Sequence, residues 1–302
     1  MQPRRITVFD TTLRDGEQSI GLAFTPDEKV AIARSLEKLG VDVIEAGFPV
    51  SSEGEHAGVR AVATAVRGPV VAAMARPAQR DLDAAATALE PAARSRVHIV
   101  LATSDLHLER KLQLSREQAV ELARWSVGYA KERFDEVEFC CEDASRSEPA
   151  FLAEICGAAI EAGATVINLP DTVGFAVPEQ YGALVREVHD LCRALASVTV
   201  AVHCHDDLGL ATANTLAGIA AGAGQFECTM NGLGERAGNA ALEEIVAALV
   251  AHEDELGVET GVDPGHLAAT SRLVADLSGY PLSPHKPVVG ANAGRDEEKY
   301  SP

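Results

Sequence analysis

Short apolar runs alternate with longer helical patterns along most of the chain. Runs rich in β-branched residues recur about every 30 residues and predict short strands. The predicted strands are Ile6–Phe9, Val41–Ala46, Val70–Ala75, Val97–Ala102, Glu136–Cys141, Thr165–Leu169, Val198–Val202 and Phe226–Met230. Between them, apolar residues at i, i+3 and i+4 predict helices, for example over Pro26–Leu39, Arg116–Arg133, Glu148–Ala162 and Pro178–Leu195.

Regular alternation of strand and helix predicts an α/β fold with a parallel sheet, because parallel strands need crossover connections. Helix signals support this pattern: Thr25 and Pro26 form a typical helix start, and Gly40 a typical helix stop. About eight strand–helix units favour a closed (β/α)8 TIM barrel over residues 1–252. A doubly wound open sheet is the competing fold, but its usual G-x-G-x-x-G turn does not occur in the sequence.

The segment 253–302 departs from the strand–helix pattern. One helix is predicted over Pro264–Leu277, and the Gly- and Pro-containing stretch 278–284 ends it. Residues 290–302 are polar and charged, and we expect them to fray. The sequence therefore predicts a short C-terminal helical extension with a tail, truncated relative to the related family described below.

Composition and charge exclude several partners. Among 302 residues, the net charge of −19 disfavours nucleic acid and anionic membranes as partners. The sequence shows neither a signal peptide nor an apolar run of membrane-spanning length. Six scattered cysteines form no Cys-x-x-Cys pair, so we expect a reducing, cytoplasmic location. A site for an anionic substrate would need local cations or a metal.

Polar side chains gather where the predicted strands end, which is where TIM barrels place their active sites. His203 and His205 are two residues apart on a strand, so their side chains leave by the same face. Asp15 follows the first strand, which only the eighth strand separates from the seventh in a closed barrel. Two imidazoles and a carboxylate are typical ligands of a divalent metal. The alternative is a pair of hydrogen-bonded interior histidines.

Further strand-end residues have more than one interpretation. Arg14 could hold a carboxylate or an enolate oxygen, or form an ion pair at the barrel mouth. Glu142 could act as a general base, or pair with Arg146. Cys140 and Cys141 are more typical of small core residues than of nucleophiles. The glycine-containing loop 231–239 would let backbone approach a ligand closely.

Six segments together resemble the acyl-CoA-condensing branch of the metal-dependent lyase and synthase barrels, which includes 2-isopropylmalate, homocitrate and citramalate synthases. They appear in the family's order between residues 5 and 250. The matching segments are Phe9–Gln18, Glu45–Ser52, Cys141–Arg146, Asn168–Gly174, His203–Gly209 and Asn231–Asn239.

The resemblance implies roles for individual residues. It assigns Asp15, His203 and His205 to a divalent metal (Mn²⁺, Mg²⁺ or Zn²⁺), with Asn239 beside it. It assigns Arg14 to the reacting oxygens, Thr172 to the carboxylate of a 2-oxo acid, and Gln18 and His107 to substrate binding. Glu142 matches an acidic residue implicated in enolisation. The implied reaction is a Claisen-type condensation of acetyl-CoA with a 2-oxo acid.

The sequence leaves the 2-oxo acid open. Residues 48–52 and 168–171 are similar to the isopropylmalate branch and favour 2-oxoisovalerate, whereas residues 142–146 and 209–216 are equally similar to homocitrate synthases. Cys140 stands where the isopropylmalate branch usually has serine.

The chain departs from the family after residue 293, where the family continues into a helical subdomain. We therefore expect one half of a split synthase completed by a second chain, a compact variant, or a lyase of the same barrel type. A non-catalytic binding subunit is a further class, which the retained Asp15, His203 and His205 disfavour. A homodimer is expected for such a barrel.

Overall fold

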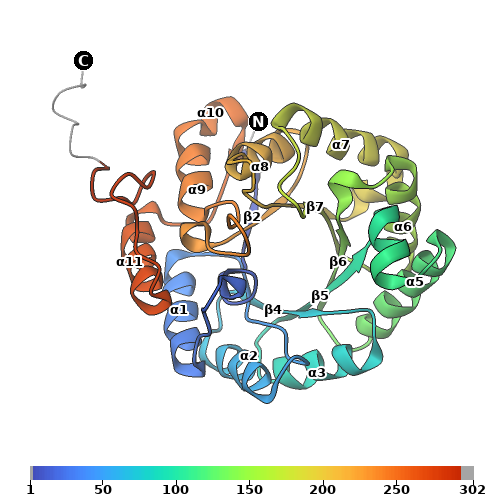
Figure 1. The fold of residues 1–302 in the computed structure, drawn as a ribbon, viewed down its shortest axis with the longest axis horizontal. Helices are drawn as coiled ribbons and strands as arrows, with labels where there is room; N and C mark the ends of the chain where they lie inside the picture. Colours follow the sequence, from blue (N-terminus) through green and yellow to red (C-terminus); the bar gives the residue numbers. More distant parts are fainter. Residues whose placement is uncertain (1–2, 294–302) are drawn as a thin grey trace.

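The computed structural model describes residues 3–293, and within them eight parallel strands close into one barrel. The helices form a ring around the strands (Figure 1). The barrel strands, in ring order, are β2 (Thr7–Asp10), β3 (Val43–Glu45), β4 (Val70–Ala75), β5 (Ser95–Ala102), β6 (Glu136–Glu142), β7 (Val166–Asp171), β8 (Thr199–Cys204) and β9 (Gln225–Cys228). The predicted TIM barrel is therefore confirmed, and the open sheet is excluded.

The main helices follow the strands in turn. They are α1 (Pro26–Leu39), α2 (Glu53–Ala65), α3 (Gln79–Leu89), α5 (Arg116–Lys131), α6 (Pro149–Ala162), α7 (Pro178–Leu191), α8 (Ala211–Ala220) and α9 (Leu242–Ala251). Helix α1 has the predicted bounds, because Thr25 caps its N-terminus and Gly40 at φ +91° ends it. The predicted helix over Pro178–Leu195 is shorter, and a 3₁₀ turn, η4 (Arg193–Ser197), follows it.

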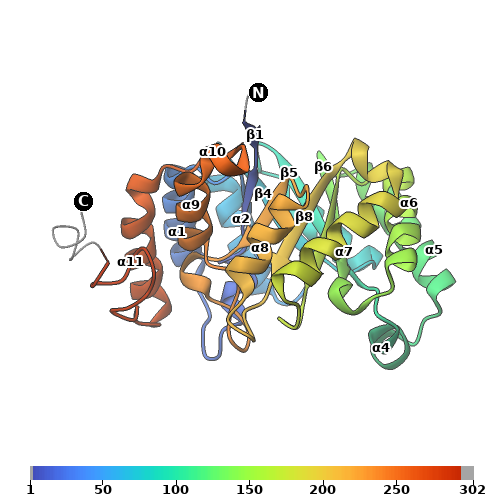
Figure 2. The ribbon, with the colours of Figure 1, turned by 90° about the horizontal axis from the view of Figure 1, so that it is seen from above.

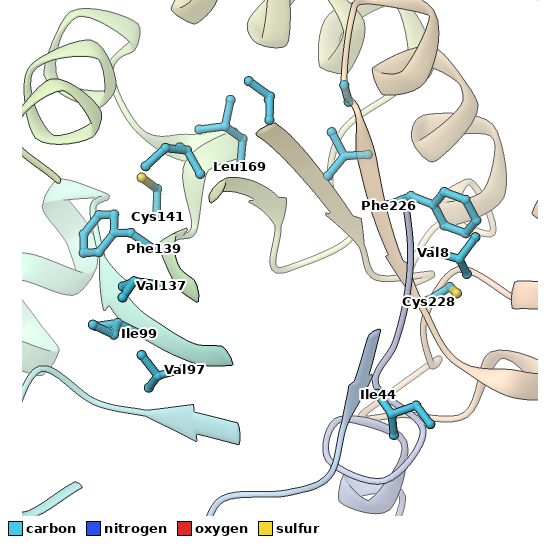
Figure 3. Packing of buried hydrophobic residues seen from close by; sticks show 14 of the residues in the cluster. Val8, Ile44, Val97, Ile99, Val137, Phe139, Cys141, Leu169, Phe226 and Cys228 are labelled. Carbon is cyan, nitrogen blue, oxygen red and sulfur yellow. The ribbon is translucent and has the colours of Figure 1, made fainter. Parts of the chain in front are cut away.

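Side chains alternate between the two faces of each barrel strand, which gives the protein two buried regions, one between the strands and the helices and one inside the barrel. Alternate residues of neighbouring strands, such as Val97 and Ile99 of β5 and Val137 and Phe139 of β6, are fully or almost fully buried in the main apolar core (Figure 3). That core joins the outer faces of the strands to the helices. The side chains at the intervening positions enter the barrel, where a small apolar group around Phe9 and Val43 gives way to polar residues.

The segment after α9 packs against the barrel. It contains α10 (Glu253–Leu256), β10 (Val258–Glu259), the turn η6 (Pro264–His266) and α11 (Leu267–Ser278). Strand β10 pairs with β1 (Arg4–Arg5) in a separate two-stranded sheet, and α11 lies beside α1 (Figures 1 and 2). The predicted helix over Pro264–Leu277 is thus observed as η6 and α11. The predicted frayed stretch 290–302 lies mostly outside the described residues.

Candidate metal centre and active site

The three proposed metal ligands converge at the carboxyl ends of the barrel strands. His203 lies in β8, and His205 follows one residue after the strand ends. Asp15 comes from the loop after β2, and one ligand atom from each residue lies within 4.8 Å of the others. Asp15 Oδ2 is 3.4 Å from His203 Nε2 and 3.7 Å from His205 Nε2. All three side chains are buried. Asp15 is far from the two histidines in the sequence, so it is the folded barrel that brings the three together.

The two histidines share one hydrogen bond, with 3.1 Å between their Nε2 atoms. Burial opposes protonation of His203, but the carboxylates of Asp15 and Glu227 outweigh it and raise the pKa of His203 to about 9. Burial and the charge on His203 lower the pKa of His205 to about 4. The alternative of a hydrogen-bonded histidine pair is therefore also observed. A divalent cation competes for the site of such a shared proton.

Glu227 of β9 fixes the orientation of His203. Its Oε2 lies 2.9 Å from His203 Nδ1, so Nδ1 carries the hydrogen and Nε2 is directed at Asp15. Histidine ligands of metals are commonly held this way, by a carboxylate on the other ring nitrogen. Glu227 is buried and lies in a strand that reads as apolar, so sequence reasoning missed it.

Asn239 lies beside His205, to which it is joined by an isolated β-bridge. Its Nδ2 donates to Leu233 O at 2.8 Å, which turns Oδ1 the other way. Gly234 makes room for this amide: its φ is +157°, and an added Cβ would overlap Asn239 Nδ2. The glycine-containing loop therefore brings Asn239 close to the histidines.

Arg14 is held between two carboxylates. Its Nη1 donates to Asp15 Oδ2 at 3.0 Å, and its Nε donates to Glu45 Oε2 at 2.7 Å. Burial raises the pKa of Glu45, but Arg14 and His98 outweigh it and lower that pKa to about 2. Arg14 forms the ion pairs of the alternative interpretation. It also lines the cavity, and its role toward a substrate oxygen stays a prediction.

Glu142 ends β6 and faces the cavity, but its partner is not the one that the sequence suggested. Lys111 Nζ donates to both carboxylate oxygens, at 2.6 and 2.9 Å, and His107 Nδ1 lies 3.4 Å from Oε1. Arg146 instead pairs with Asp143, which has a left-handed backbone with φ of +69°. The left-handed residue redirects the chain, so the predicted Glu142–Arg146 pair is wrong.

One cavity of about 240 Å³ joins these groups at the barrel mouth. Arg14, Asp15, Gln18, Glu142, Thr172, His203 and His205 all line it. Thr172 Oγ1 accepts a hydrogen bond from Asp143 N at 2.8 Å. His107 and Asn239 do not line it directly but contact residues that do. The structure therefore brings every predicted site residue to one place.

Sequence reasoning missed several residues of the cavity wall. They include His98, Lys111, Asn168 and Glu227. For His98, Asn168 and Glu227 the available signal was a polar residue within an apolar strand run, because alternation directs it into the barrel, whereas Lys111 lies in a helical turn that gave no such signal. Cys140 lines the cavity and Cys141 lies in the core. Burial raises the pKa of the Cys140 thiol to about 11, which fits the non-nucleophilic interpretation.

The donor set fits a divalent metal. Two imidazoles and a carboxylate suit Zn²⁺, Mn²⁺ and related ions. Within residues 3–293, Asp15 Oδ1 and Asn239 Oδ1 are buried atoms with no hydrogen-bond partner. Such atoms are rare in native proteins and usually have a ligand or water. The residues present can therefore hold a metal ion.

A closed barrel with a polar cavity at the carboxyl ends of its strands places the chain in the class of TIM-barrel enzymes. A sequence model described as HMGL-like matches residues 5–274. The chain belongs to the HMGL-like family and, within it, to the group of the 2-isopropylmalate synthases.

Individual relatives support this placement. A 2-isopropylmalate synthase from Neisseria meningitidis serogroup B is 51% identical over 97% of the chain and 56% of the relative. 2-Isopropylmalate synthase 1 from Caldanaerobacter subterraneus subsp. tengcongensis is 48% identical, over 98% of the chain and 75% of the relative. The chain thus spans little more than half of the Neisseria protein.

A solved structure shares the fold. The hydroxymethylglutaryl-CoA lyase of Pseudomonas aeruginosa superposes with a TM-score of 0.79 at 23% identity, covering 93% of the chain and 95% of the lyase. At this identity the likeness concerns the fold alone. Separately, no helix within residues 3–293 has the length and apolar character needed to cross a membrane.

Proposed function

We propose that this chain carries the site that condenses acetyl-CoA with 2-oxoisovalerate to give 2-isopropylmalate. The observation that supports it most directly is the convergence of Asp15, His203 and His205 beside Arg14 and Glu142 in one cavity. The relatives named 2-isopropylmalate synthase, whose sequences are 51% and 48% identical to the chain, support the same reaction.

Asp15, His203 and His205 would hold a divalent ion, with Asn239 next to it and Mn²⁺, Mg²⁺ and Zn²⁺ as the candidates. When bound, such an ion supplies Lewis-acid polarisation of a 2-oxo group and its carboxylate. Glu227 keeps His203 in the tautomer that binds through Nε2.

The remaining residues would position the two substrates. Arg14 lies beside Asp15 and would stabilise negative charge on the oxygen of the reacting 2-oxo group. Thr172 and Gln18 line the same cavity and would bind the carboxylate of the 2-oxo acid. His107, next to Glu142, would contact the substrate near the base.

Glu142 would act as the base. Its carboxylate takes a proton from the methyl group of acetyl-CoA, and that carbon forms a bond to C2 of the 2-oxo acid. The former oxo oxygen takes up a proton and becomes a hydroxyl. Water then cleaves the thioester, which releases the CoA thiol and leaves a second carboxylate on the product.

The cavity favours a 2-oxo acid with an uncharged, branched side chain over 2-oxoglutarate. Its wall includes the apolar side chains of Met74, Val100 and Pro170. The arginine and lysine side chains that line it are already paired with carboxylates: Arg14 with Asp15 and Glu45, Lys111 with Glu142, and Arg236 with Asp207. A second substrate carboxylate would therefore meet buried negative charge, including that of Glu227.

Binding and turnover together test the proposal. Calorimetric titration of the Mn²⁺-loaded chain with 2-oxoisovalerate, 2-oxoglutarate and pyruvate should give the tightest binding for 2-oxoisovalerate. Thiol release from acetyl-CoA should then depend on that 2-oxo acid and on the metal. Tightest binding of 2-oxoglutarate would favour homocitrate synthesis. Thiol release without any 2-oxo acid, or product cleavage without synthesis, would indicate a thioesterase or a lyase.

Four expectations accompany this proposal. The homodimer and a second chain that completes the site remain predictions, and sedimentation analysis of the pure chain tests the first. The division of the chain at residue 252 also remains a prediction. A cytoplasmic location is proposed on the cysteine pattern alone.

A further inference from the structure

A buried lysine lies behind the loop that carries Arg14 and Asp15. Lys29 projects from α1, and its side chain is 1% exposed. Its ammonium donates to two backbone carbonyls, Leu13 O at 3.1 Å and Ala46 O at 3.2 Å. It also pairs with Glu17 Oε2 at 2.6 Å and Glu55 Oε1 at 2.8 Å. One cation thus joins the loops after β2 and β3 to α1 and α2.

The surroundings are built to accommodate this side chain. Gly58 of α2 faces the stem of Lys29, where an added Cβ would lie 3.1 Å from Lys29 Cδ. Gly47 has φ of +151°, and an added Cβ would overlap the Glu55 carboxylate. Larger residues at either glycine would crowd the ammonium or its partner. Two positions that lack a side chain therefore frame the buried cation.

The contacts of Lys29 end next to the metal-binding residues. Leu13, whose carbonyl accepts from Lys29, directly precedes Arg14 and Asp15. From the barrel side, Glu45 holds Arg14 Nε, and Thr11 Oγ1 accepts from Asp15 N at 3.2 Å. The loop is consequently fixed from the inside by Glu45 and from the outside by Lys29.

We propose that Lys29 is a positioning residue, which fixes the Arg14–Asp15 loop in the conformation that the metal centre requires without touching metal or substrate. This inference rests on the proposed metal site at Asp15. The physical reason is preorganisation: a ligand held by the fold loses less freedom when the ion binds.

General stabilisation is a weaker explanation for this lysine. Burying an ammonium costs free energy, and a buried set of ion pairs replaced as a whole by uncharged side chains of similar volume is often equally stable. Methionine at position 29 with glutamine at positions 17 and 55 would fill the same space without a buried charge. What methionine cannot supply is the pair of hydrogen bonds to Leu13 O and Ala46 O.

The chain offers matched controls. Arg4 also places a cation on backbone carbonyls, those of Ile219 and Ala223, at 3.0 and 2.5 Å, but at the opposite end of the barrel. Lys38 lies exposed in the last turn of α1, the helix that carries Lys29. Arg4→Met thus removes the same kind of contact, a cation on backbone carbonyls, from an exposed residue, and Lys38→Met removes the same charge.

The experiment measures Mn²⁺ affinity by calorimetric titration and folding by thermal unfolding, without any substrate. Lys29→Met should weaken Mn²⁺ binding by about 10–100-fold, the range typical of residues that orient metal ligands. Arg4→Met should lower the unfolding temperature but keep the affinity, and Lys38→Met should change neither. Equal affinity in Lys29→Met and the unaltered chain would overturn the inference.

A triple variant covers the case in which Lys29→Met fails to fold because Glu17 and Glu55 lose their cation. Lys29→Met with Glu17→Gln and Glu55→Gln removes all three charges, and it should fold yet still bind Mn²⁺ weakly. Full affinity in this variant would also overturn the inference. Failure of the underlying metal site looks different: Asp15→Ala would then bind Mn²⁺ as the unaltered chain does.

Discussion

Two layers of buried polar side chains inside the barrel differ in how many of their atoms have hydrogen-bond partners within the protein. The lower layer lies toward the amino-terminal ends of the strands, and the upper layer lies toward their carboxyl ends. In the lower layer, Arg96 donates to Glu136 at 2.8 Å, Glu138 at 3.0 Å and Gln225 at 2.8 Å. Gln225 in turn donates to Glu138 at 2.8 Å. In the upper layer of the described chain, buried polar atoms lack partners. These atoms are Asp15 Oδ1, His98 Nε2, Asn168 Oδ1, His205 Nδ1 and Asn239 Oδ1.

The difference distinguishes polar residues that stabilise the fold from polar residues that are available to bind a ligand. A buried polar group without a partner costs about 1–3 kcal/mol, so several such groups together indicate a place that a ligand or ordered water completes. The hydrogen bonds of the lower layer run mainly among its own residues, and Glu138 is the member that lies within 4.8 Å of Glu227 and His98 in the upper layer. The upper layer leaves buried polar atoms without protein partners, which supports the proposal that metal and substrate bind there.

The largest expected effect comes from removing the carboxylate of the upper layer. Asp15→Ala should abolish Mn²⁺ binding and activity together, because it removes one of three converging ligands. The fold should survive, since the apolar core lies on the outer side of the strands. Titration and circular dichroism check this, and full metal occupancy would show that another residue is the ligand.

Glu142→Gln should have the next largest effect. Turnover should fall by ~10²–10⁴-fold, because the amide cannot accept the methyl proton. Binding of 2-oxoisovalerate, measured by calorimetry, should remain. Glu109→Gln is the control, because it makes the same change at an exposed residue of the helical turn Leu108–Leu112. Unchanged turnover in Glu142→Gln would assign the base to a different residue.

Glu227→Gln tests the support of His203 and should weaken Mn²⁺ binding by about 10–100-fold. Glu138→Gln is its matched control. Burial and the neighbouring Glu227 raise the pKa of Glu138 to about 8, so a neutral glutamine resembles its form at pH 7. Comparable weakening by both substitutions would mean that general disturbance of the interior, and not the Glu227–His203 contact, controls affinity.

Arg96→Met should have the smallest effect on the site. It leaves Glu136 without its cation and removes the hydrogen-bond donor of Glu138 and Gln225, and breaking a buried pair in this way costs about 3–5 kcal/mol of unfolding free energy. Mn²⁺ affinity should be unchanged at temperatures where the variant is folded. Chemical denaturation and metal titration measure the two quantities. A large loss of affinity would mean that the two layers are not independent.

Much of the fold follows from local signals in the sequence. The eight strands lie where apolar runs predicted them, and Thr25 and Gly40 set the ends of α1. Less regular segments were not predicted, among them the π-helical turn at Leu108–Leu112 and the pairing of β1 with β10. These depend on contacts between distant parts of the chain, which local periodicity does not encode.

The sequence by itself determined which chemical groups end the strands. The H-x-H spacing put His203 and His205 on one face, and the barrel prediction brought Asp15 to the same rim. Those conclusions needed only the two-residue period of a strand and the rule that parallel strands end at one edge.

Only the tertiary structure decided how these groups are held. Lys111 rather than Arg146 pairs with Glu142, Glu227 orients His203, and Lys29 supports the Asp15 loop. Each partner lies 16 to 31 residues from the group it contacts, on a different element. The physical reason is that an ion pair or hydrogen bond depends on distances of about 3 Å. The packing of the whole barrel sets such distances.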